Sequence, residues 1–586
     1  MTPVATRRGY LLTSAAIVAF SLGVELRRVI PSDTGFLLYI AGRVLDGAHL
    51  YVDIIEINPP LIVGLNLPIV LAARALDVPE ILVYRLAVAA LVLACIGLTG
   101  RVLGYLFSAG DARWRRWILL LLTLVLFLLS GAYFGEREHL MLALISPYLA
   151  LVAVRAVKQP APWWEAASVG ALAGLGFALK PHFLLLFVAV EAYLLVRRRD
   201  AARPARPETL AVAGVLLAYG VVVLLVTPDY VRMVRLLGGT YLEFLYDPFL
   251  HLLVTGPGVI LSWFAVLAWI ALSKHLRPPA LGEVLVVAVV GALLAGAAQQ
   301  KGFPYHFYPS WALALMLLGV LVAHSWNALR GAAERLYHVL AGAVLATAVI
   351  LAVVQGSLLL AGRGRPGGEP ELMPLSRLVR ETAHGQPIFV MSYHIGSAFP
   401  LINYSGAVLG SRFHHFWILA ADYLDRMKSP EPLRYRAPEE MPASERYLNA
   451  AVLADLERYR PRLLIVLRNA RDDPGNGYRR YDYIRYFERD PRFTKILSQY
   501  QELDTVGNYV VYERVLGSEP RVRPPPTATP GTLDLRRRRA DVLGLGLWSP
   551  SFLLRLGVFL TMIAGLTALQ LVRRTQRSES APADGM

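Results

Sequence analysis

Cysteine is almost absent from this sequence. Cys95 is the single cysteine among 586 residues, and it lies inside an apolar run. One cysteine forms no intrachain disulfide and no thiolate metal cluster. Any exported part of the chain must therefore fold without covalent cross-links.

Several short motifs are also missing. His139, His182 and His306 fall in three different segments, and none of these segments has the spacing of metal ligands. The sequence contains no glycine-rich nucleotide-phosphate loop and no local Ser/His/Asp signature, which disfavours ATP-driven transport. The first apolar run is followed by Glu25 to Arg28 instead of a small-residue cleavage site. We therefore predict an uncleaved first membrane helix.

Charged residues are scarce, at 17% of the chain, whereas 55% of the residues are hydrophobic and the mean hydropathy is +0.47. Many apolar runs approach the ~20 residues that cross a bilayer as a helix. The formal net charge is +16, but lysine and arginine lie mainly in short loops and form no basic face interleaved with aromatic residues. The composition predicts a polytopic α-helical membrane protein surrounded by lipid, with no nucleic-acid partner.

The loop charges orient the chain, because arginine and lysine concentrate on the cytoplasmic side of short connections. The basic connections expected inside are 7–8, 113–116, 155–158, 197–199, 274–277 and 330–335. The connections expected outside are 31–79, 134–139, 180–182, 228–251, 299–306 and 363–540. We predict about 12 spanning helices with both termini cytoplasmic, in a bacterial-type plasma (inner) membrane.

Parity adds a prediction that hydropathy alone would miss. Between Asp33, outside, and Arg113, inside, the number of crossings must be odd, yet two apolar runs are present, 60–76 and 81–107. The first run is short and contains Asn66, Pro68 and Arg74. We expect 60–76 to lie at the outer surface or to re-enter.

The chain is expected to divide into three parts. Residues 1–362 form the membrane domain, 363–541 a small extracytoplasmic α/β domain, and 542–586 the last membrane helix with a cytoplasmic tail. A proline-rich linker, 524–530, closes the α/β domain. The basic run 536–539 lies on the outer side in this scheme, which is tolerable because the orientation rule weakens for long connections.

Secondary structure in the α/β domain follows from its apolar patterns. The predicted strands are 387–392, 461–467 and 508–514, and the predicted amphipathic helices are 443–459 and 483–500.

Asp33 is the first candidate for a functional role. It follows the apolar run 11–24 by about one helical turn, so its carboxylate should lie where a substrate with a lipid tail and a polar head can meet it. On position alone a structural role is favoured, because aspartate caps the start of a helix such as 34–45.

The other unusual polar residues fall on the same predicted side. Residues 134–139 place Glu136, Arg137, Glu138 and His139 between two spanning helices, and charges so close to lipid usually face a cavity. Two later connections contribute Lys180, Lys301 and His306, cationic groups that suit a phosphate or pyrophosphate. For any one lysine, snorkelling toward headgroups is the structural alternative.

These features, in this order, carry a family resemblance. Asp33, Gly47, Tyr51 and the AsnProPro of 58–60 resemble the first external loop of GT-C membrane glycosyltransferases. The branch that contains protein O-mannosyltransferases and the lipid A aminoarabinose transferase is the most similar. The resemblance continues through the charged second loop, the Lys180 turn, the Lys301 loop and the closing external domain, and so covers most of the chain.

The resemblance implies an inverting transfer of a hexose or pentose from a polyprenyl-phosphate donor to a lipid, glycan or protein acceptor on the extracytoplasmic side. Asp33 would be the general base, and Glu136 or Glu138 the second-loop acidic residue. The remaining implied residues bind the donor phosphate (Arg137, Lys180, Lys301 and His306) or line the substrate cavity (Tyr51, His139, His182 and Tyr305).

The chain departs from the family at Thr34, where a glutamate often follows the aspartate. We therefore assign no metal and no certain cofactor, although Asp33 with a second-loop glutamate could hold a divalent cation. A translocator of lipid-linked glycans is the alternative from another class. It is disfavoured because no internal repeat is evident. A polymerase or ligase of preassembled glycans would share the same outer-face chemistry.

Overall fold

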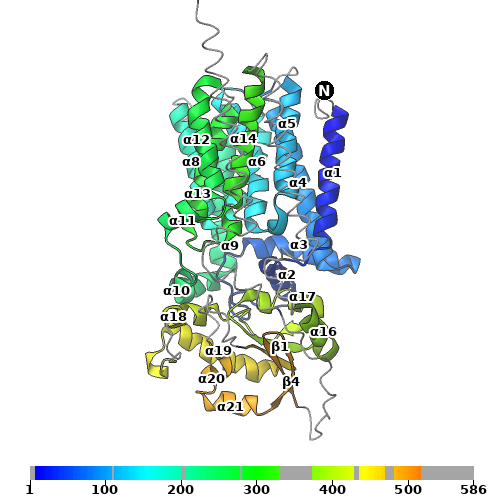
Figure 1. The fold of residues 1–586 in the computed structure, drawn as a ribbon, viewed down its shortest axis with the longest axis vertical. Helices are drawn as coiled ribbons and strands as arrows, with labels where there is room; N and C mark the ends of the chain where they lie inside the picture. The colour runs from blue at the N-terminus through cyan, green and yellow to red at the C-terminus, as the bar shows by residue number, and fades with distance from the viewer. Residues whose placement is uncertain are drawn as a thin grey trace, which may run out of the picture.

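A computed structural model of the protein describes residues 7–107, 111–198, 206–276, 280–328, 372–427, 434–468 and 481–515. Long helices run side by side in the upper part of Figure 1, and an α/β domain lies beyond one end of them. α1 begins at the opposite end of the bundle. The basic connection 330–335, the linker 524–530, the basic run 536–539 and the segment 542–586 fall outside the described residues.

Two groups of helices make up this part of the chain. The helices of the bundle are α1 (Arg7–Glu25), α4 (Glu80–Leu103), α5 (Ala112–Thr123), α6 (Arg137–Ala156), α7 (Trp163–Ala178), α8 (Leu184–Arg197), α9 (Pro207–Val226), α12 (Val259–Leu276), α13 (Ala280–Ala298) and α14 (Tyr308–Ala328). The helices at the end that faces the α/β domain are α2 (Ser32–Leu45), α3 (Leu61–Leu76), α10 (Pro228–Glu243) and α11 (Phe249–Thr255). α5 continues into a π-helical stretch, Leu124–Leu128.

The chain is a membrane protein. Within the described ranges, five helices are long and apolar enough to span a membrane, or six if the bent pair α11 and α12 forms one span. The five are α4, α6, α9, α13 and the helix that runs through α14. The total of about twelve spans stays a prediction.

Helix α3 corresponds to the apolar run 60–76, which the odd number of crossings between Asp33 and Arg113 predicts not to span the membrane. It has 16 residues with Pro68 inside and ends at Asp77 in the left-handed conformation. At ~1.5 Å per residue it is about 24 Å long, less than the ~30 Å hydrocarbon core. It packs against α2 and α4 at the end of the bundle that faces the α/β domain. Its length is compatible with a surface location.

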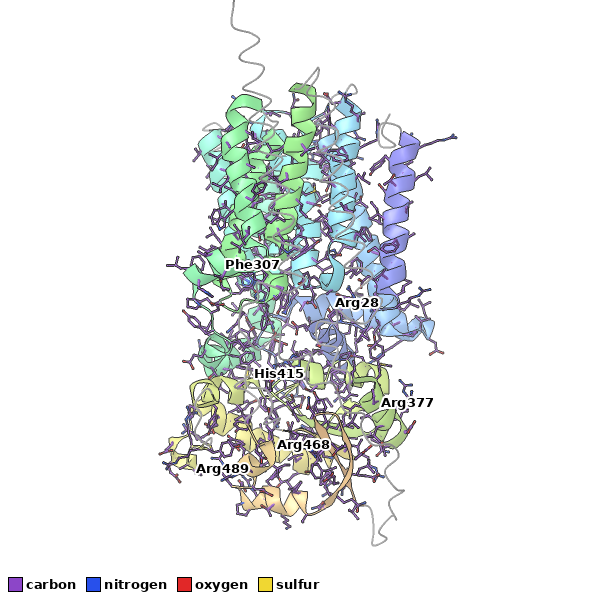
Figure 2. All side chains as sticks on the ribbon, in the orientation of Figure 1. Arg28, Phe307, Arg377, His415, Arg468 and Arg489 are labelled. Atoms are coloured by element: carbon purple, nitrogen blue, oxygen red, sulfur yellow. The ribbon has the colours of Figure 1, made fainter. Side chains whose placement is uncertain are left out.

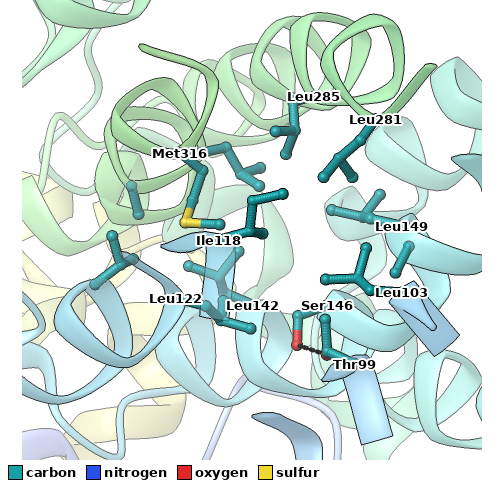
Figure 3. Close-up of a pocket in the computed structure, with 14 residues that line it drawn as sticks. Thr99, Leu103, Ile118, Leu122, Leu142, Ser146, Leu149, Leu281, Leu285 and Met316 are labelled. Atoms are coloured by element: carbon teal, nitrogen blue, oxygen red, sulfur yellow. Dashed lines mark hydrogen bonds between the residues drawn. The ribbon is translucent and has the colours of Figure 1, made fainter. Parts of the chain in front are cut away.

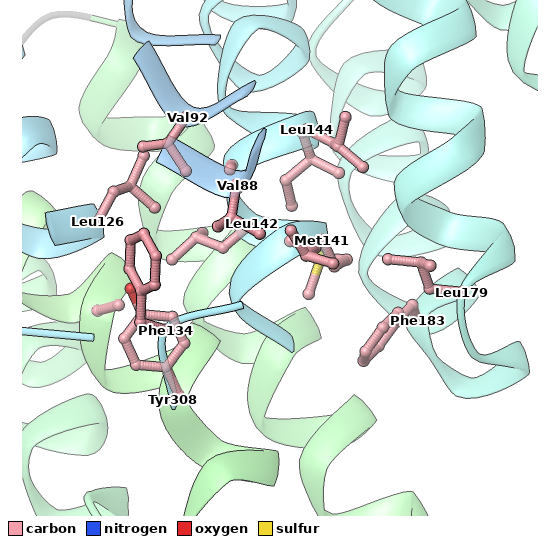
Figure 4. Packing of buried hydrophobic residues seen from close by; sticks show 14 of the residues in the cluster. Val88, Val92, Leu126, Phe134, Met141, Leu142, Leu144, Leu179, Phe183 and Tyr308 are labelled. Atoms are coloured by element: carbon pink, nitrogen blue, oxygen red, sulfur yellow. The ribbon is translucent and has the colours of Figure 1, made fainter. Parts of the chain in front are cut away.

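Packing in the bundle centres on α6. Nearly all its residues are buried, including Met141 and Leu142. Figure 4 shows them among side chains from α4, Leu179 just after α7, and Tyr308 at the start of α14. A Cβ at Gly176 would lie 3.2 Å from the Leu144 side chain, so glycine lets α7 approach α6 closely. A void of about 30 Å³ is lined mainly by apolar side chains, and Thr99 and Ser146 at its edge share a hydrogen bond (3.1 Å; Figure 3). This void is too small for a substrate.

The α/β domain is built on a mixed sheet in the order β2-β1-β3-β5-β4. β1 pairs in parallel with β2 and β3, whereas β5 pairs antiparallel with β3 and β4. The strands are β1 (Pro387–Met391), β2 (Val408–Leu409), β3 (Leu463–Leu467), β4 (Tyr500–Val506) and β5 (Tyr509–Arg514). The helices are α16 (Leu372–Ala383), α17 (Leu401–Ser405), α18 (Trp417–Met427), α19 (Ala443–Tyr459), α20 (Tyr483–Phe487) and α21 (Pro491–Leu497).

The sequence predictions for this domain are confirmed at β1, β3, β5 and α19. The prediction of one helix over 483–500 is wrong. Asp490 accepts a hydrogen bond from the backbone N–H of Arg492, and Pro491 occupies the first helical position, so a new helix starts there. β4 then begins at Tyr500.

Helix α2 joins the two domains. The backbone N–H of Leu409 donates to the Tyr39 hydroxyl (2.9 Å), and the Asn403 amide donates to the carbonyl of Gly35 (3.0 Å). A Cβ at Gly35 would lie 2.7 Å from the Asn403 side chain, so this contact requires glycine. The α/β domain is thus fixed directly onto the helix that carries Asp33.

Candidate active site

A cavity of about 820 Å³ lies at the junction of the helices and the α/β domain, near the position of His415 in Figure 2. Every predicted outer connection that the structure describes contributes to its lining. Polar and aromatic side chains in the lining include Asp33, Glu56, Tyr133, Glu136, Arg137, Lys180, His182, Tyr241, Lys301, Tyr305, His306, Tyr393, His394, His414, His415 and Trp417. Segments far apart in sequence therefore form one site.

Asp33 lies in the first turn of α2 and does not cap it. The N-cap position is Pro31, and no side chain caps this helix, so the capping role expected from the sequence is wrong. The carboxylate instead lies 3.7 Å from the guanidinium of Arg137 and accepts a hydrogen bond from the Tyr305 hydroxyl at 3.5 Å. Its side chain is 29% exposed. Asp33 can therefore meet a ligand in the cavity.

The two second-loop glutamates differ in their surroundings. Glu138 is fully buried and does not line the cavity, and its Oε1 accepts a hydrogen bond from Lys180 at 2.6 Å. Glu136 lines the cavity and accepts a hydrogen bond from the Thr34 hydroxyl (3.1 Å). Thr34, the position that departs from the family pattern, thus still connects the first loop to the second. Glu136 is the better candidate for contact with substrate.

Glu136 binds its proton tightly. Burial and the neighbouring carboxylate of Asp33 raise the pKa of Glu136 to about 8. At neutral pH Glu136 is therefore mostly protonated.

Arg137 is a buried cation with unused donors. It begins α6, and its Nε and Nη1 have no hydrogen-bond partner among the described residues. Buried polar groups of this kind are normally satisfied, so these donors are available to an anion or to water. A guanidinium suits a phosphate because it donates two parallel hydrogen bonds.

Lys180 lies just past the end of α7, as predicted. Its ammonium donates to Glu138 and to the side-chain oxygen of Gln299 (3.1 Å), and it lies 5.3 Å from the centre of the Tyr305 ring. Burial lowers the pKa of Lys180, and the Glu138 carboxylate opposes that shift. Lys180 thus couples the buried Glu138 to the cavity.

Lys301 lines the cavity, but its ammonium is committed elsewhere. It donates to the backbone carbonyls of Tyr241 (2.7 Å), Leu242 (3.0 Å) and Phe244 at the C-terminal end of α10. These carbonyls have no helical partner, and a cation there also meets the negative end of the helix dipole. Lys301 therefore holds α10 against the cavity, and its predicted role in phosphate binding stays a prediction.

Replacing Lys301 with methionine separates these two roles. We expect a loss of ~1.5–3 kcal/mol of stability from the lost charge-assisted hydrogen bonds, seen as a lower melting midpoint. Binding of a polyprenyl phosphate, the ligand class that the family resemblance implies, should change little when it is measured at a temperature where the variant is folded. Weakened lipid binding with unchanged stability would instead support a direct phosphate contact.

His306 and His182 lie at the cavity, as expected. Nδ1 of His306 and Nε2 of His182 are buried and have no hydrogen-bond partner in the parts of the chain that the structure describes. The His306 ring stands edge-on to Tyr305, with ring centres 4.4 Å apart. Burial lowers the pKa of His182 well below its usual value, and the charge of Lys180 adds to this shift. His182 is therefore neutral and is not a phosphate-binding cation.

Two predicted cavity residues do not line the cavity. His139 is held by the carbonyl of Leu126 (2.7 Å) and the N–H of Gly135 (3.1 Å). Successive helical residues turn by about 100°, so His139 faces away from Arg137 by about 200°. Tyr51 is buried and donates to the carbonyl of Asn58 (2.8 Å), which shapes the loop behind the cavity wall.

Several residues that line the cavity were not predicted from the sequence. Glu56 is buried, and its Oε1 accepts hydrogen bonds from the N–H groups of Ile57 and Asn58 (2.7 Å each). Its position two residues before the AsnProPro motif is a signal that could have found it. The α/β domain adds Tyr393, His394, His414, His415 and Trp417, for which no sequence pattern gives a signal.

The site does not fit a divalent cation. Among the described residues, no group of three or more histidine, cysteine, aspartate or glutamate side chains is arranged to hold a metal ion. Asp33 faces Arg137, and Glu138 already pairs with Lys180. Protein cations thus neutralise the carboxylates that a metal would need as ligands.

Comparison with known proteins gives a fold but no sequence relative. No protein-family model matches the chain, and no curated protein matches it by sequence. Solved structures with a similar fold include ArnT from Cupriavidus metallidurans bound to undecaprenyl phosphate. Its TM-score is 0.56 at 13% identity, over 88% of this chain and 100% of that one.

The same enzyme in the apo state gives a TM-score of 0.52 at 13% identity, over 86% of this chain and 97% of that one. Another solved structure is that of the archaeal oligosaccharyltransferase AglB from Archaeoglobus fulgidus, in complex with an inhibitory peptide and a dolichol-phosphate. Its TM-score is 0.44 at 12% identity, over 87% of this chain and 75% of that one. The ArnT comparison spans both the helices and the α/β domain. The predicted likeness to the GT-C branch that contains the aminoarabinose transferase is thereby confirmed at the level of the fold.

Proposed function

We propose that this protein is an integral membrane glycosyltransferase that moves a sugar from a polyprenyl-phosphate donor to a hydroxyl-bearing acceptor. The observation that carries the proposal is the junction cavity, in which the partly exposed Asp33 carboxylate lies beside the buried guanidinium of Arg137. A base and a phosphate-binding cation at one point are what this reaction requires. The ArnT structure, bound to undecaprenyl phosphate, has the same fold.

In the proposed reaction, Asp33 accepts the proton of the acceptor hydroxyl as that oxygen attacks the anomeric carbon. The new carbon–oxygen bond forms opposite the bond to the phosphate oxygen, which breaks, so the sugar inverts. Polyprenyl phosphate leaves with the electron pair. Arg137 stabilises its growing negative charge, and the ammonium of Lys180 adds to the positive field.

The proposed location of the site is the extracytoplasmic face of a bacterial-type plasma membrane. The basic connections at the other ends of the helices support this orientation. Protease added to intact spheroplasts should digest the α/β domain, and full protection of that domain would overturn the orientation.

The function itself is tested by sugar transfer. Purified full-length protein in nanodiscs is incubated with radiolabelled sugars on undecaprenyl phosphate and with membrane extract as the source of acceptor. We expect transfer of label together with release of undecaprenyl phosphate. Movement of intact labelled lipid across sealed vesicles, without cleavage of the sugar–phosphate bond, would favour a translocator instead.

Ionisation of Glu136 should weaken phosphate binding at alkaline pH. Below its pKa of about 8 the side chain is neutral, and above it a second negative charge appears beside Asp33. We expect undecaprenyl phosphate to bind several-fold more weakly at about pH 9 than at about pH 7 in the wild type, and with a flatter profile in Glu136→Gln. Burial lowers the pKa of Lys301 to about 8 as well, but that titration persists in the variant. Identical profiles for both proteins would contradict this assignment.

A further inference from the structure

The α/β domain forms a wall of the cavity that is chemically unlike the membrane side. Its contribution comes from two connections, after β1 and after β2, and includes His414, His415 and Trp417. Arg137 and Lys180, by contrast, come from the helices. The described part of the α/β wall carries imidazole and aromatic groups in place of permanently charged cations.

The two adjacent imidazoles of this wall are uncharged and incompletely bonded. Burial lowers the pKa of His414 to about 3, and burial together with neighbouring imidazoles lowers the pKa of His415 well below its usual value. His414 is 7% exposed, and Nδ1 of each ring lacks a hydrogen-bond partner within the described ranges. A neutral imidazole offers one donor and one acceptor. Buried polar atoms are normally satisfied, so a ligand or water completes these bonds.

The rings are held in place. His414 stacks on Phe36 of α2 with ring centres 3.9 Å apart, and His415 stands edge-on to His414 at 4.3 Å. The preceding Arg412 is fixed by Asp455 (2.8 Å), and its carbonyl accepts a hydrogen bond from the N–H of Ile55 (2.8 Å). The wall is therefore preformed, which lowers the entropic cost of binding.

We propose that His414, His415 and Trp417 form a subsite for an uncharged carbohydrate ring. Neutral imidazoles exchange hydrogen bonds with sugar hydroxyls. Trp417, 3% exposed and packed against Tyr241 and Phe244, adds apolar lining beside them. A phosphate gains more from the permanent charge of Arg137 than from neutral imidazoles, so we assign it to the Arg137 side. The inference rests on the proposed function and assigns the sugar to the α/β side of the cavity. The ring belongs either to the donor or to a glycan acceptor.

The test uses full-length protein in nanodiscs and saturation-transfer NMR with the methyl glycosides of glucose, mannose and arabinose. We expect the wild type to give signals with at least one glycoside. The double variant H414F/H415F keeps the ring packing but loses the nitrogens. Its affinity for the glycoside should be at least about fivefold lower than that of the wild type, which is the loss expected from one hydrogen bond. His49 is exposed and lies outside the cavity lining, so H49F serves as the matched control.

Undecaprenyl phosphate binding and the melting midpoint show whether the variants are folded. H414Q/H415Q, which keeps donors and acceptors, provides a second variant and should retain more binding than the phenylalanine pair. No signal from any glycoside with the wild type, or equal binding by the wild type and a folded H414F/H415F, would overturn the subsite. Glycoside binding does not require catalysis, so it can succeed even where the transfer assay fails.

Competition distinguishes the two sources of the ring. Displacement of the glycoside by a sugar-bearing undecaprenyl phosphate, but not by undecaprenyl phosphate alone, assigns the subsite to the donor. If the glycoside and the radiolabelled sugar-bearing undecaprenyl phosphate bind at the same time, and label then appears on the glycoside, the subsite belongs to the acceptor. Either result supports a carbohydrate subsite on this wall.

Discussion

Asp33→Asn is expected to reduce sugar transfer by ~10²–10⁴-fold, the range that a positioned general base contributes. The amide has the shape of the carboxylate but cannot accept the proton of the attacking hydroxyl. Because the hydrogen bond from Tyr305 can still be accepted by the amide oxygen, the geometry near Arg137 should survive. Donor binding should therefore persist while the maximal rate falls.

The rate is measured with radiolabelled donor, and donor binding is measured separately. Asp53→Asn is the matched control, because Asp53 lies in the same segment, pairs with Arg458 (3.3 Å) and does not line the cavity. This control should transfer sugar as the wild type does. Full activity of a folded Asp33→Asn protein would remove Asp33 from the role of base.

Lys180→Met should be among the most destabilising single changes in the membrane domain. Lys180 and Glu138 form a pair at 2.6 Å, with side chains 5% and 0% exposed. Removing one partner leaves a charge buried without compensation, which costs ~3–5 kcal/mol. We expect a markedly lower melting midpoint in detergent or nanodiscs.

The double variant Lys180→Met/Glu138→Gln removes both charges and should recover most of that loss. It should still bind undecaprenyl phosphate more weakly than the wild type, because the cation near the phosphate is missing. Arg74→Met provides the contrast, since its pair with Asp46 is 42% and 50% exposed and should contribute less than ~1 kcal/mol. If Lys180→Met melts like Arg74→Met, the pair does not carry a buried charge.

The membrane side of the site could be predicted from sequence because charge is expensive there. Arg137 and Lys180 stand out among apolar runs, and the loop charges place them on one side with Asp33. β1 and β3 were equally readable, since short apolar runs in a polar domain indicate buried strands. His139 was misplaced because neighbours in sequence point in different directions once the helix begins at Arg137.

The other half of the site could not be read from the sequence. His414 and His415 are an ordinary pair of residues in a polar domain, and only the pairing of β1 with β2 and the contact with α2 bring them to Asp33's cavity. The helix break at Pro491 has a local sequence signal, because an aspartate precedes the proline. The helical periodicity of the surrounding residues was given more weight than this signal. Tertiary placement and helix direction, more than secondary structure, limited the prediction.

The attachment of α2 to the α/β domain sets an order of events during biosynthesis. Asp33 leaves the ribosome early, but the groups that bind its helix, Asn403 and the backbone N–H of Leu409, are made more than three hundred residues later. A nascent chain that has inserted only its first helices therefore has the proposed base but no enclosed cavity. Such a chain should be inert toward lipid-linked sugars in the membrane. The proposed chemistry would then begin only after residues 403–409 have been made and the α/β domain has docked on α2.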